Sequence, residues 1–534
     1  MQKIKLFDTT LRDGTQSAGI SPSVEDKLKI AARIDELGVS YIEGGWPGSN
    51  PKDEDFFKRA RKLKLKNARL VAFGSTRRKG IPASEDSNLQ SILDVGVKTA
   101  CIFGKTWEFH VIHALRTTRE ENINMIADSI KYLKSKGLEV IYDAEHFFDG
   151  YRADKSYALL TLHAAVKAGA DTITLCDTNG GMLPNDIRVI IRELKKKINI
   201  PLGIHTHNDS DCAVANTLVA VEEGCVLTQG TINGIGERAG NANLISVIPG
   251  IMLKLKKKCI SPEQLQTLTE VSRYVSGILN MVPSDHQPYV GYSAFAHKGG
   301  VHASAMARHT ETYEHINPEA VGNKRQILIS ELSGRSNVIS KIKELNIDFD
   351  DTTGASKKII DSLKTLENEG YQFEGAEGSF VLLIHKAMGS FKPFFELKGF
   401  RTVVEKDWRT GQMISEATIK VKVGDHVEHM VSEGDGPVNA LDGALRKALE
   451  KFYPELIEVS LVDFRVRVIN AVSGTAAKVR VLIESRDNTE AWSTIGVSEN
   501  IIEASWQALV DGVEYKLLKA KNEKHKAQNV KHKA

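Results

Sequence analysis

The first 260 residues alternate short apolar runs with longer stretches in which apolar side chains recur every three or four positions. A short run of β-branched or apolar residues predicts a buried strand, and the longer period predicts an amphipathic helix. The helical stretches end close to glycine, which favours a helix C-terminus. The strand runs are residues 4–7, 41–45, 69–74, 98–104, 138–145, 172–178, 202–207 and 226–232, and the clearest helical stretches are 23–38, 119–137 and 154–170.

This pattern amounts to eight strand–helix units in the first 260 residues, which is the usual size of a (β/α)8 TIM barrel. A doubly wound open sheet is the structural alternative, because local periodicity does not reveal whether a sheet closes. The count of eight units favours the barrel, and we predict a TIM-barrel catalytic domain over residues 1–260.

The regular alternation of strand-like and helix-like stretches ends after Lys258. Residues 261–372 predict a mainly helical connecting subdomain, which is interrupted by a polar, His-rich segment at 293–309. Strand-like runs at 380–387, 417–423 and 464–471 then alternate with helical stretches. This predicts an α+β domain over 373–516 made of two similar halves, each with a helix. Residues 517–534 are Lys-rich without apolar periodicity, which predicts a basic flexible tail.

Composition narrows the protein class. Of the 534 residues, 41% are hydrophobic and 26% charged, as is usual for a soluble globular protein. A net charge of +3 is small for this length, so we expect no nucleic-acid or membrane surface. The five cysteines are odd in number and form no CxxC pair, which indicates reduced, buried thiols in a cytoplasmic protein. No apolar run is long enough to cross a bilayer.

Polar residues gather where the predicted barrel strands end, and barrel enzymes carry their sites on the loops at the C-terminal ends of the strands. The first, fifth, sixth, seventh and eighth strands contribute, in order, Asp8, Arg12, Asp13 and Gln16; Asp143, Glu145 and His146; Asp177, Thr178 and Asn179; His205 and His207; and Glu237, Arg238 and Asn241.

The two histidines of the seventh strand suggest a metal site. Residues i and i+2 of a strand point to the same face, so His205 and His207 project together. A closed barrel places the first strand, and with it Asp13, beside the eighth. With Asn241, these side chains predict a divalent metal site for Mg, Mn or Zn, with open positions for a chelating 2-oxo acid. A buried pair of core histidines is the alternative, and each ring would then need a polar partner.

The neighbouring polar residues suggest roles in a reaction that adds a nucleophile to a carbonyl group. Arg12 is predicted to stabilise the developing alkoxide, or else only to neutralise Asp8 or Asp13. Glu145 is predicted to orient the substrate or move a proton. Thr178 is predicted either to bind the substrate carboxylate or to cap the next helix.

Five motifs together resemble the 2-isopropylmalate synthase and homocitrate synthase family: DTTLRDG, HTHND, GIGERAGN, AFAHKGGVH and SGR. The resemblance implies a Claisen-type condensation of acetyl-CoA, as co-substrate, with a metal-bound 2-oxo acid. It implies Asp13, His205, His207 and Asn241 as metal ligands, and Arg12, Glu145 and His302 as catalytic residues. Substrate contacts are implied for Arg12, Gln16, Glu145 and Thr178. A homodimer and an amino-acid-responsive regulatory domain are implied as well.

Within that family, the stretch YIEGGWPGSNPKD at 41–53 is similar to the citramalate synthases. The resemblance implies pyruvate as acceptor, citramalate and CoA as products, and isoleucine as effector. The alternative is 2-oxoisovalerate as acceptor, as in 2-isopropylmalate synthases. Trp46 is expected either to narrow the pocket toward pyruvate or to pack outward.

The chain departs from the family pattern at two places in the connecting subdomain. His302 is followed by Ala303, Ser304 and Ala305 where HQDG is usual, and 331–333 read Glu-Leu-Ser where GKH is common. We expect these changes to affect substrate choice or acyl-CoA handling. GIGERAGN also lacks the cysteine of the related acyl-CoA lyases, and the ligand order differs from that of non-haem iron oxygenases. The complete ligand set argues against an amino-acid sensor without activity.

Overall fold

The computed structural model describes residues 3–297, 302, 305, 306, 308–327, 339, 342, 345, 347, 354–373, 375–469 and 477–531. The chain divides into two compact units. The first comprises Met1–Phe295 with Glu314–Arg325, and the second comprises Ala296–Tyr313 with Gln326–Ala534. Each unit is described separately below.

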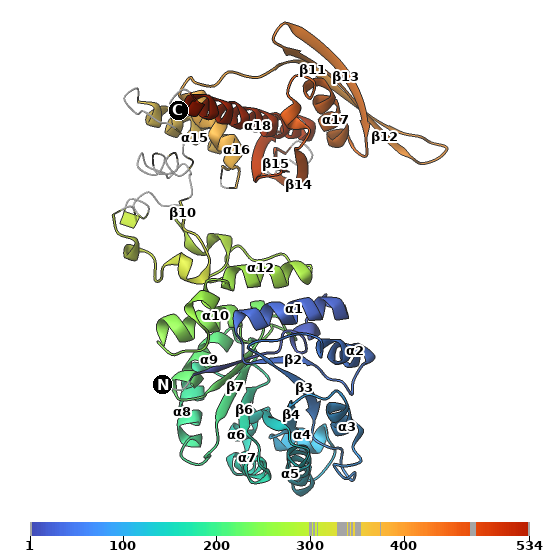
Figure 1. Ribbon diagram of the computed structural model, residues 1–534, viewed down its shortest axis with the longest axis vertical. Coiled ribbons are helices and arrows are strands. Elements are labelled where there is room, and N and C mark those ends of the chain that lie inside the picture. Colours follow the sequence, from blue (N-terminus) through green and yellow to red (C-terminus); the bar gives the residue numbers. More distant parts are fainter. Residues whose placement is uncertain are drawn as a thin grey trace. The chain divides into compact units, whose positions relative to one another are not determined.

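The first unit contains a closed barrel of eight parallel strands in sequential order (Figure 1). The strands are β1 (Lys5–Asp8), β2 (Tyr41–Gly45), β3 (Arg69–Ser75), β4 (Thr99–Lys105), β5 (Glu139–Glu145), β6 (Thr172–Asp177), β7 (Leu202–Thr206) and β8 (Leu227–Gly230). β1 pairs with β8 from Lys5↔Leu227 to Asp8↔Gly230, which closes the sheet. The predicted TIM barrel is confirmed, and the open sheet is excluded.

Helices surround the barrel and cover its outer face (Figure 1). They are α1 (Val24–Leu37), α2 (Pro51–Ala60), α3 (Ser87–Asp94), α4 (Glu108–His113), α5 (Arg119–Ser135), α6 (Phe147–Ala153), α7 (Lys155–Ala168), α8 (Pro184–Leu194), α9 (Ala213–Glu222) and α10 (Leu244–Pro249). α1 begins with a capping box at Ser23 and ends at Gly38, whose φ of 93° is the left-handed C-cap conformation. Such local signals explain why the sequence predicted these helices.

After the barrel, α11 (Pro262–Leu265) and α12 (Leu268–Ile278) complete the helices of the first unit. Short 3-10 turns lie at Gly14–Gln16, Ile232–Gly234, Tyr292–Phe295, Thr310–Thr312, Pro318–Val321 and Pro454–Leu456, and a π-helical turn lies at Gly250–Lys254. β9 (Ala296–His297) and β10 (Gln326–Ile327) form a two-stranded parallel pair in the second unit. The predicted departure at 331–333 lies outside the described residues.

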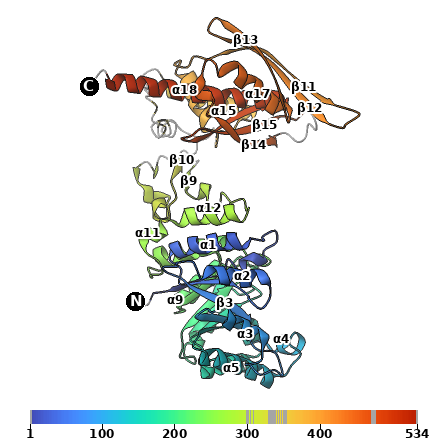
Figure 2. The same cartoon turned by 45° about the vertical axis from the view of Figure 1, so that its right-hand side comes forward.

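The second unit contains two three-stranded antiparallel sheets, each packed against a helix (Figure 2). β11 (Glu396–Lys406), β12 (Met413–Val423) and β13 (His426–Gly434) pack on α17 (Pro437–Leu449). β14 (Ser460–Val468), β15 (Val479–Arg486) and β16 (Ala491–Ser498) pack on α18 (Ile501–Lys531). The prediction of two similar halves with one helix each is therefore confirmed.

Two local predictions in the second unit differ from the structure. The run at 380–387, predicted as a strand, lies in the helix α16 (Glu377–Ala387), which packs against α15 (Ala355–Glu369), α18 and β16. The run begins with five consecutive apolar residues at 380–384, and a short continuous apolar run reads the same in a helix and in a strand, which explains the error. α18 continues to Lys531, through most of the predicted flexible tail, because Lys, Ala, Gln and Glu favour helix once a packed turn precedes them.

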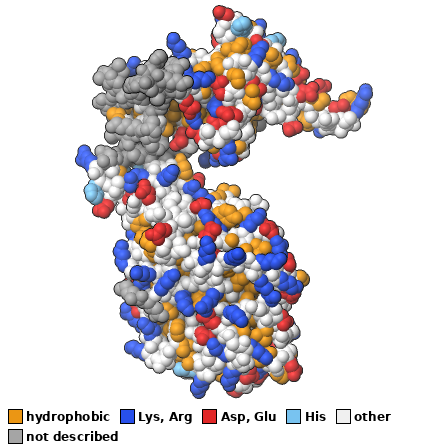
Figure 3. All heavy atoms as spheres, in the orientation of Figure 1, with side chains coloured by type: hydrophobic (Ala, Val, Ile, Leu, Met, Phe, Trp, Pro, Cys, Tyr) orange, Lys and Arg blue, Asp and Glu red, His pale blue; other side chains and the backbone are white. Residues whose placement is uncertain are grey.

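The surface and the thiols bear on the class of protein. All five cysteines are free, and four of them are buried. On the face drawn in Figure 3, Lys and Arg side chains of the barrel unit are interspersed with acidic and apolar ones. No helix within the described residues combines the length and the apolar character needed to span a membrane.

A buried ion pair ties α1 to α2 beneath the loop that follows β2. Lys27 Nζ lies 2.5 Å from Asp53 Oδ1, and the two side chains are only 3% and 10% exposed. Lys27 Nζ also donates to the carbonyl of Gly44. The other oxygen, Asp53 Oδ2, accepts from the backbone N–H of Trp46.

We predict that Asp53→Ala lowers the free energy of unfolding by about 3–5 kcal/mol, because it leaves Lys27 buried without its counter-charge. Urea unfolding of the full chain measures this. Glu25→Ala removes an exposed pair with Arg59 and serves as the matched control, with an expected loss of about 0–1 kcal/mol. Equal losses in the two variants would contradict the argument.

Candidate active site

The C-terminal ends of the barrel strands enclose a cavity of about 200 Å³. It is lined by Arg12, Asp13, Gln16, Trp46, Phe73, Phe103, Asp143, Glu145, Cys176, Thr178, His205, His207 and Glu237. The structure thus brings together seven of the nine predicted site residues on one cavity. Asn241 contacts the same group from behind, and His302 belongs to the second unit.

Asp13, His205 and His207 form a compact buried cluster. Asp13 Oδ2 lies 3.5 Å from His205 Nε2 and 4.0 Å from His207 Nε2. The ligand atoms of the three residues all lie within 4.8 Å of one another. Burial raises the pKa of Asp13, but Arg12 and the two imidazoles more than offset this and bring it to about 2. Burial lowers the pKa of His207 to about 3. Both groups therefore stand in the forms that bind a cation, carboxylate and neutral imidazole.

Asn241 reaches the cluster because the loop after β8 folds back onto the end of β7. Asn241 forms an isolated backbone bridge with His207. Its Nδ2 lies 3.0 Å from Asp13 Oδ2 and 3.2 Å from His205 Nε2, while its buried Oδ1 has no hydrogen-bond partner. A half-turn of the amide exchanges the two atoms and points the unpartnered oxygen at the cluster. A Cβ on Gly236 would lie 1.9 Å from Oδ1, so this loop requires glycine there.

Gln229 orients His205, and sequence reasoning missed it. His205 Nδ1 lies 2.8 Å from Gln229 Oε1, which as an acceptor requires the proton on Nδ1 and leaves the Nε2 lone pair facing the cluster. Gln229 Nε2 in turn donates to Asp143 Oδ1 at 2.8 Å. The signal in the sequence that could have revealed this residue was a single amide side chain inside the strand β8. Partners of this kind fix the tautomer of a metal-binding histidine.

Arg12 is held by Glu43, a second residue that sequence reasoning missed. Arg12 Nε donates to Glu43 Oε2 at 2.7 Å, and the guanidinium carbon lies 3.8 Å from the centre of the Phe73 ring. Burial lowers the Arg12 pKa, but Glu43 and Asp13 reverse this and raise it. Asp8 does not pair with Arg12, because it accepts from the backbone N–H and the hydroxyl of Thr10. A carboxylate inside the buried strand β2 was the available signal.

Glu145, Thr178 and Gln16 stand around the cavity wall. Glu145 pairs with Lys105 Nζ. Thr178 Oγ1 accepts from the backbone N–H of His146 at 2.8 Å and so braces the start of α6. It does not cap α8, the next helix. Gln16 ends the 3-10 turn after Asp13 and is exposed at the rim.

His302 is exposed, and its ring stacks on Tyr313 at a centroid separation of 4.1 Å. Both residues belong to the second unit. The role that the sequence resemblance implied for His302 stays a prediction.

Trp46 forms an aromatic wall with Phe73 and Phe103. The indole ring meets these rings edge-on at centroid separations of 5.6 and 5.7 Å. Its Nε1 donates to Asn88 Oδ1 at 2.6 Å, and Asn88 Nδ2 donates to the carbonyl of Ser75. Of the two positions expected for Trp46, the structure has the ring lining the cavity.

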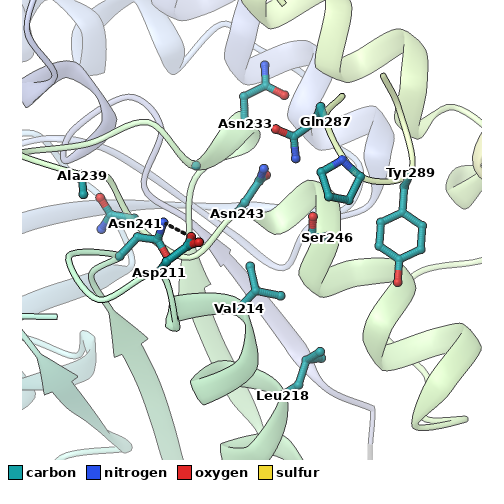
Figure 4. Close-up of a pocket in the computed structure, with 13 residues that line it drawn as sticks. Asp211, Val214, Leu218, Asn233, Ala239, Asn241, Asn243, Ser246, Gln287 and Tyr289 are labelled. Carbon is teal, nitrogen blue, oxygen red and sulfur yellow. Dashed lines mark hydrogen bonds between the residues drawn. The ribbon is translucent and has the colours of Figure 1, made fainter. Parts of the chain in front are cut away.

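A second cavity of about 490 Å³ lies on the far side of Asn241 (Figure 4). Its polar lining consists of amide, hydroxyl and carboxylate side chains, with no Lys or Arg. The polar residues are Asn208, Asp211, Asn233, Asn241, Asn243, Ser246, Gln287 and Tyr289.

Three family descriptions match successive parts of the chain. Residues 3–275 match "HMGL-like", residues 289–371 match "Homocitrate synthase post-HMGL domain-like", and residues 374–517 match "LeuA allosteric (dimerisation) domain". The first alone spans more than half of the 534 residues.

Named relatives match along almost the entire length. The chain is 58% identical to an "(R)-citramalate synthase" of Geobacter sulfurreducens, over 97% of this chain and 98% of the relative. It is 53% identical to an "(R)-citramalate synthase" of Aquifex aeolicus, over 98% and 99%. A "2-isopropylmalate synthase" of Methanocaldococcus jannaschii is 33% identical over 98% and 96%. These matches confirm the resemblance drawn from the motifs. The chain belongs to the family of HMGL-like acyltransferases that contains these (R)-citramalate synthases and the 2-isopropylmalate synthase.

Proposed function

We propose that the protein condenses acetyl-CoA with pyruvate to give citramalate and CoA, in the synthesis of isoleucine. The acetyl methyl group loses a proton, its carbon bonds to the ketone carbon, and water cleaves the thioester. Five relatives named (R)-citramalate synthase share 47–58% of residues with this chain, whereas a 2-isopropylmalate synthase and a further (R)-citramalate synthase, both of Methanocaldococcus jannaschii, share 33% and 32%. The observation that carries the proposal is the Asp13–His205–His207 cluster on a small cavity with an aromatic wall.

The donor set fits a divalent metal. One ionised carboxylate, two imidazoles and an amide whose oxygen lacks a partner are the mixed ligands that Mg, Mn and Zn accept. Asp13, His205, His207 and Asn241 would hold the ion, and Gln229 would keep the His205 lone pair directed at it. A metal there supplies Lewis-acid polarisation of the acceptor ketone.

Arg12 and Glu145 are proposed to act on the reacting atoms. Arg12 bonds Glu43 through Nε, and its Nη1 lies 3.5 Å from Asp13 Oδ2, so Nη2 is the donor proposed for the alkoxide oxygen. Glu43 and Phe73 hold the guanidinium in place, so little reorganisation is needed as charge develops. Glu145 is proposed to orient the acetyl group or accept its proton, with Lys105 as its counter-ion. Gln16 and Thr178 are proposed substrate contacts, and His302 a further catalytic group.

The aromatic wall supports pyruvate as acceptor. The indole of Trp46 is held by its hydrogen bond to Asn88 and by the rings of Phe73 and Phe103, and its backbone N–H donates to the Asp53 carboxylate. The ring therefore cannot easily move aside for a larger group. The cavity of about 200 Å³ is also smaller than the pockets of about 300–1,000 Å³ that hold drug-sized ligands.

The second unit is proposed to form a homodimer and to bind an amino-acid effector. The match to an allosteric (dimerisation) domain supports this. Four apolar side chains on one face of β14 are 37–52% exposed, which is the surface that an unpartnered sheet would offer to a second copy: Val462, Phe464, Val466 and Val468. Isoleucine is the proposed effector, as the end product of the pathway.

Release of CoA from acetyl-CoA, measured with a divalent metal and each of several 2-oxo acids, tests the function. We expect a clear preference for pyruvate over 2-oxobutyrate, 2-oxoisovalerate and 2-oxoglutarate. We further predict that Trp46→Leu raises kcat/KM for 2-oxobutyrate relative to pyruvate by about 10–100-fold, because the wall loses the ring that excludes an extra methylene.

Trp408→Leu is the matched control, since that indole is 85% exposed in the second unit. The control should leave the preference unchanged. A wild-type preference for 2-oxoisovalerate would overturn the assignment to pyruvate while keeping the chemistry.

We predict that His207→Ala loses bound metal and activity together, as measured by elemental analysis after dialysis and by CoA release. Gln229→Leu should weaken metal binding by about 10–100-fold in competition with a chelator, because His205 loses the acceptor that fixes its tautomer. His163→Ala, on the exposed side of α7, is the control. An active, metal-replete His207→Ala protein would refute the ligand assignment.

We predict that isoleucine inhibits the intact enzyme and binds it in calorimetry, whereas valine and leucine at the same concentration act more weakly. The absence of both binding and inhibition by isoleucine would contradict the effector assignment. Inhibition by leucine and not by isoleucine would point instead to a role in leucine synthesis.

A further inference from the structure

A larger cavity adjoins the acceptor cavity behind the aromatic wall. It measures about 570 Å³ and is formed by the segment after β3, the end of β4, the residues after α4 and one side chain of α5. Its lining residues are Trp46, Ser75, Thr76, Arg77, Arg78, Lys79, Ile81, Phe103, Gly104, Lys105, Ala114, Leu115 and Met125. Nothing in the chemistry described so far uses it.

The two cavities meet at the residues that carry the proposed chemistry. Trp46 and Phe103 line both cavities. Lys105 lines the larger one, and its ammonium pairs with Glu145 on the acceptor cavity. A group that reaches the end of the larger cavity therefore arrives beside Glu145, the proposed proton acceptor.

The charge on the larger cavity is positive. Four of its lining residues are cationic and none is acidic. Arg77 is neutralised by Glu121 and Asp128, at 2.8 and 2.9 Å, and Lys105 by Glu145. Arg78 and Lys79 are exposed, and within the described part of the chain neither pairs with a carboxylate. Lys79 Nζ donates only to the carbonyl of Arg116. The lining thus keeps two cations, Arg78 and Lys79, that have no acidic partner among the residues that the structure describes.

The loop that carries these cations is held in place by its backbone. The N–H of Arg77 donates to Ser129 Oγ at 2.8 Å, and the N–H of Arg78 donates to Asp86 Oδ2 at 2.9 Å. The N–H of Gly80 donates to Glu121, and its φ of +72° requires glycine. A loop ordered in this way loses little further entropy when a ligand binds.

We propose that this cavity binds the CoA portion of acetyl-CoA, with Arg78 and Lys79 as the ligands of its phosphate groups. The proposal rests on the proposed function. A CoA thioester is a phosphorylated nucleotide joined to a long, weakly polar arm, and the lining of the cavity offers a match for each of these parts. Its lining has the exposed cations Arg78 and Lys79 and the apolar side chains of Ile81, Leu115 and the buried Met125. It shares Trp46 and Phe103 with the acceptor cavity.

The cavity behind Asn241 fits this ligand less well. It is comparable in size, at about 490 Å³, but its lining has Asp211 and no cation (Figure 4). Several phosphate charges there would face a carboxylate without compensation. Charge therefore favours the cavity lined by Arg78 and Lys79.

Steady-state kinetics of the full chain tests the proposal. We expect Arg78→Ala and Lys79→Ala each to raise KM for acetyl-CoA by about tenfold, as for the loss of one charge-assisted hydrogen bond, with little change in KM for pyruvate. Acetyl-pantetheine lacks the nucleotide phosphates, so KM for this substrate should be the same in wild type and variants. Arg78→Lys should recover most of the loss.

Lys196→Ala is the matched control, because it removes one exposed positive charge after α8, at the opposite end of the barrel strands. This variant should leave KM unchanged for acetyl-CoA, acetyl-pantetheine and pyruvate. Unaltered KM for acetyl-CoA in both alanine variants, or an equal rise in KM for acetyl-pantetheine, would overturn the proposal. Calorimetry with CoA as the sole ligand tests the proposed CoA site separately from the proposed function. If the wild type releases no CoA from acetyl-CoA with pyruvate, the proposed function fails, whereas a tenfold weaker CoA affinity in the variants still supports this site.

Discussion

Pairing of β1 with β8 closes the barrel, and the cluster of Asp13, His205 and His207 depends on that closure. Asp13 follows β1, whereas His205 and His207 lie at the end of β7, about 190 residues further along the chain. The register from Lys5↔Leu227 to Asp8↔Gly230 brings the ends of these strands to one rim, and the loop after β8 then bridges to His207 through Asn241. An open sheet would leave β1 and β8 at opposite edges and the carboxylate far from the imidazoles.

Hydrogen-bond partners fix the direction of His205 and Arg12 in the cluster. Gln229 and Asp143 orient His205, while Glu43 and Phe73 hold Arg12. Buried charge is tolerated only when it is paired, so these partners both stabilise the fold and preorganise the site. Two atoms of this group, Asn241 Oδ1 and His207 Nδ1, are buried without a hydrogen-bond partner.

Trp46 divides the space above the barrel into two cavities of different character. On one side lie the ligand cluster and Arg12, and on the other lie the cations of the loop after β3. A small acceptor and a long, charged donor thus have separate approaches that meet at Glu145 and Lys105. One indole, fixed by Asn88, serves as a wall of both.

The sequence by itself determined the eight barrel strands, the barrel class and the residues at the strand ends, because alternation, capping and strand-end polarity are local signals. It misassigned 380–387, since the continuous apolar stretch at 380–384 has no period to reveal its conformation. Only the tertiary structure decided that Gln229 and Glu43 support His205 and Arg12, that Trp46 faces the cavity, and that a cationic cavity adjoins it. Those relations join residues far apart in the chain, and barrel closure alone makes them neighbours.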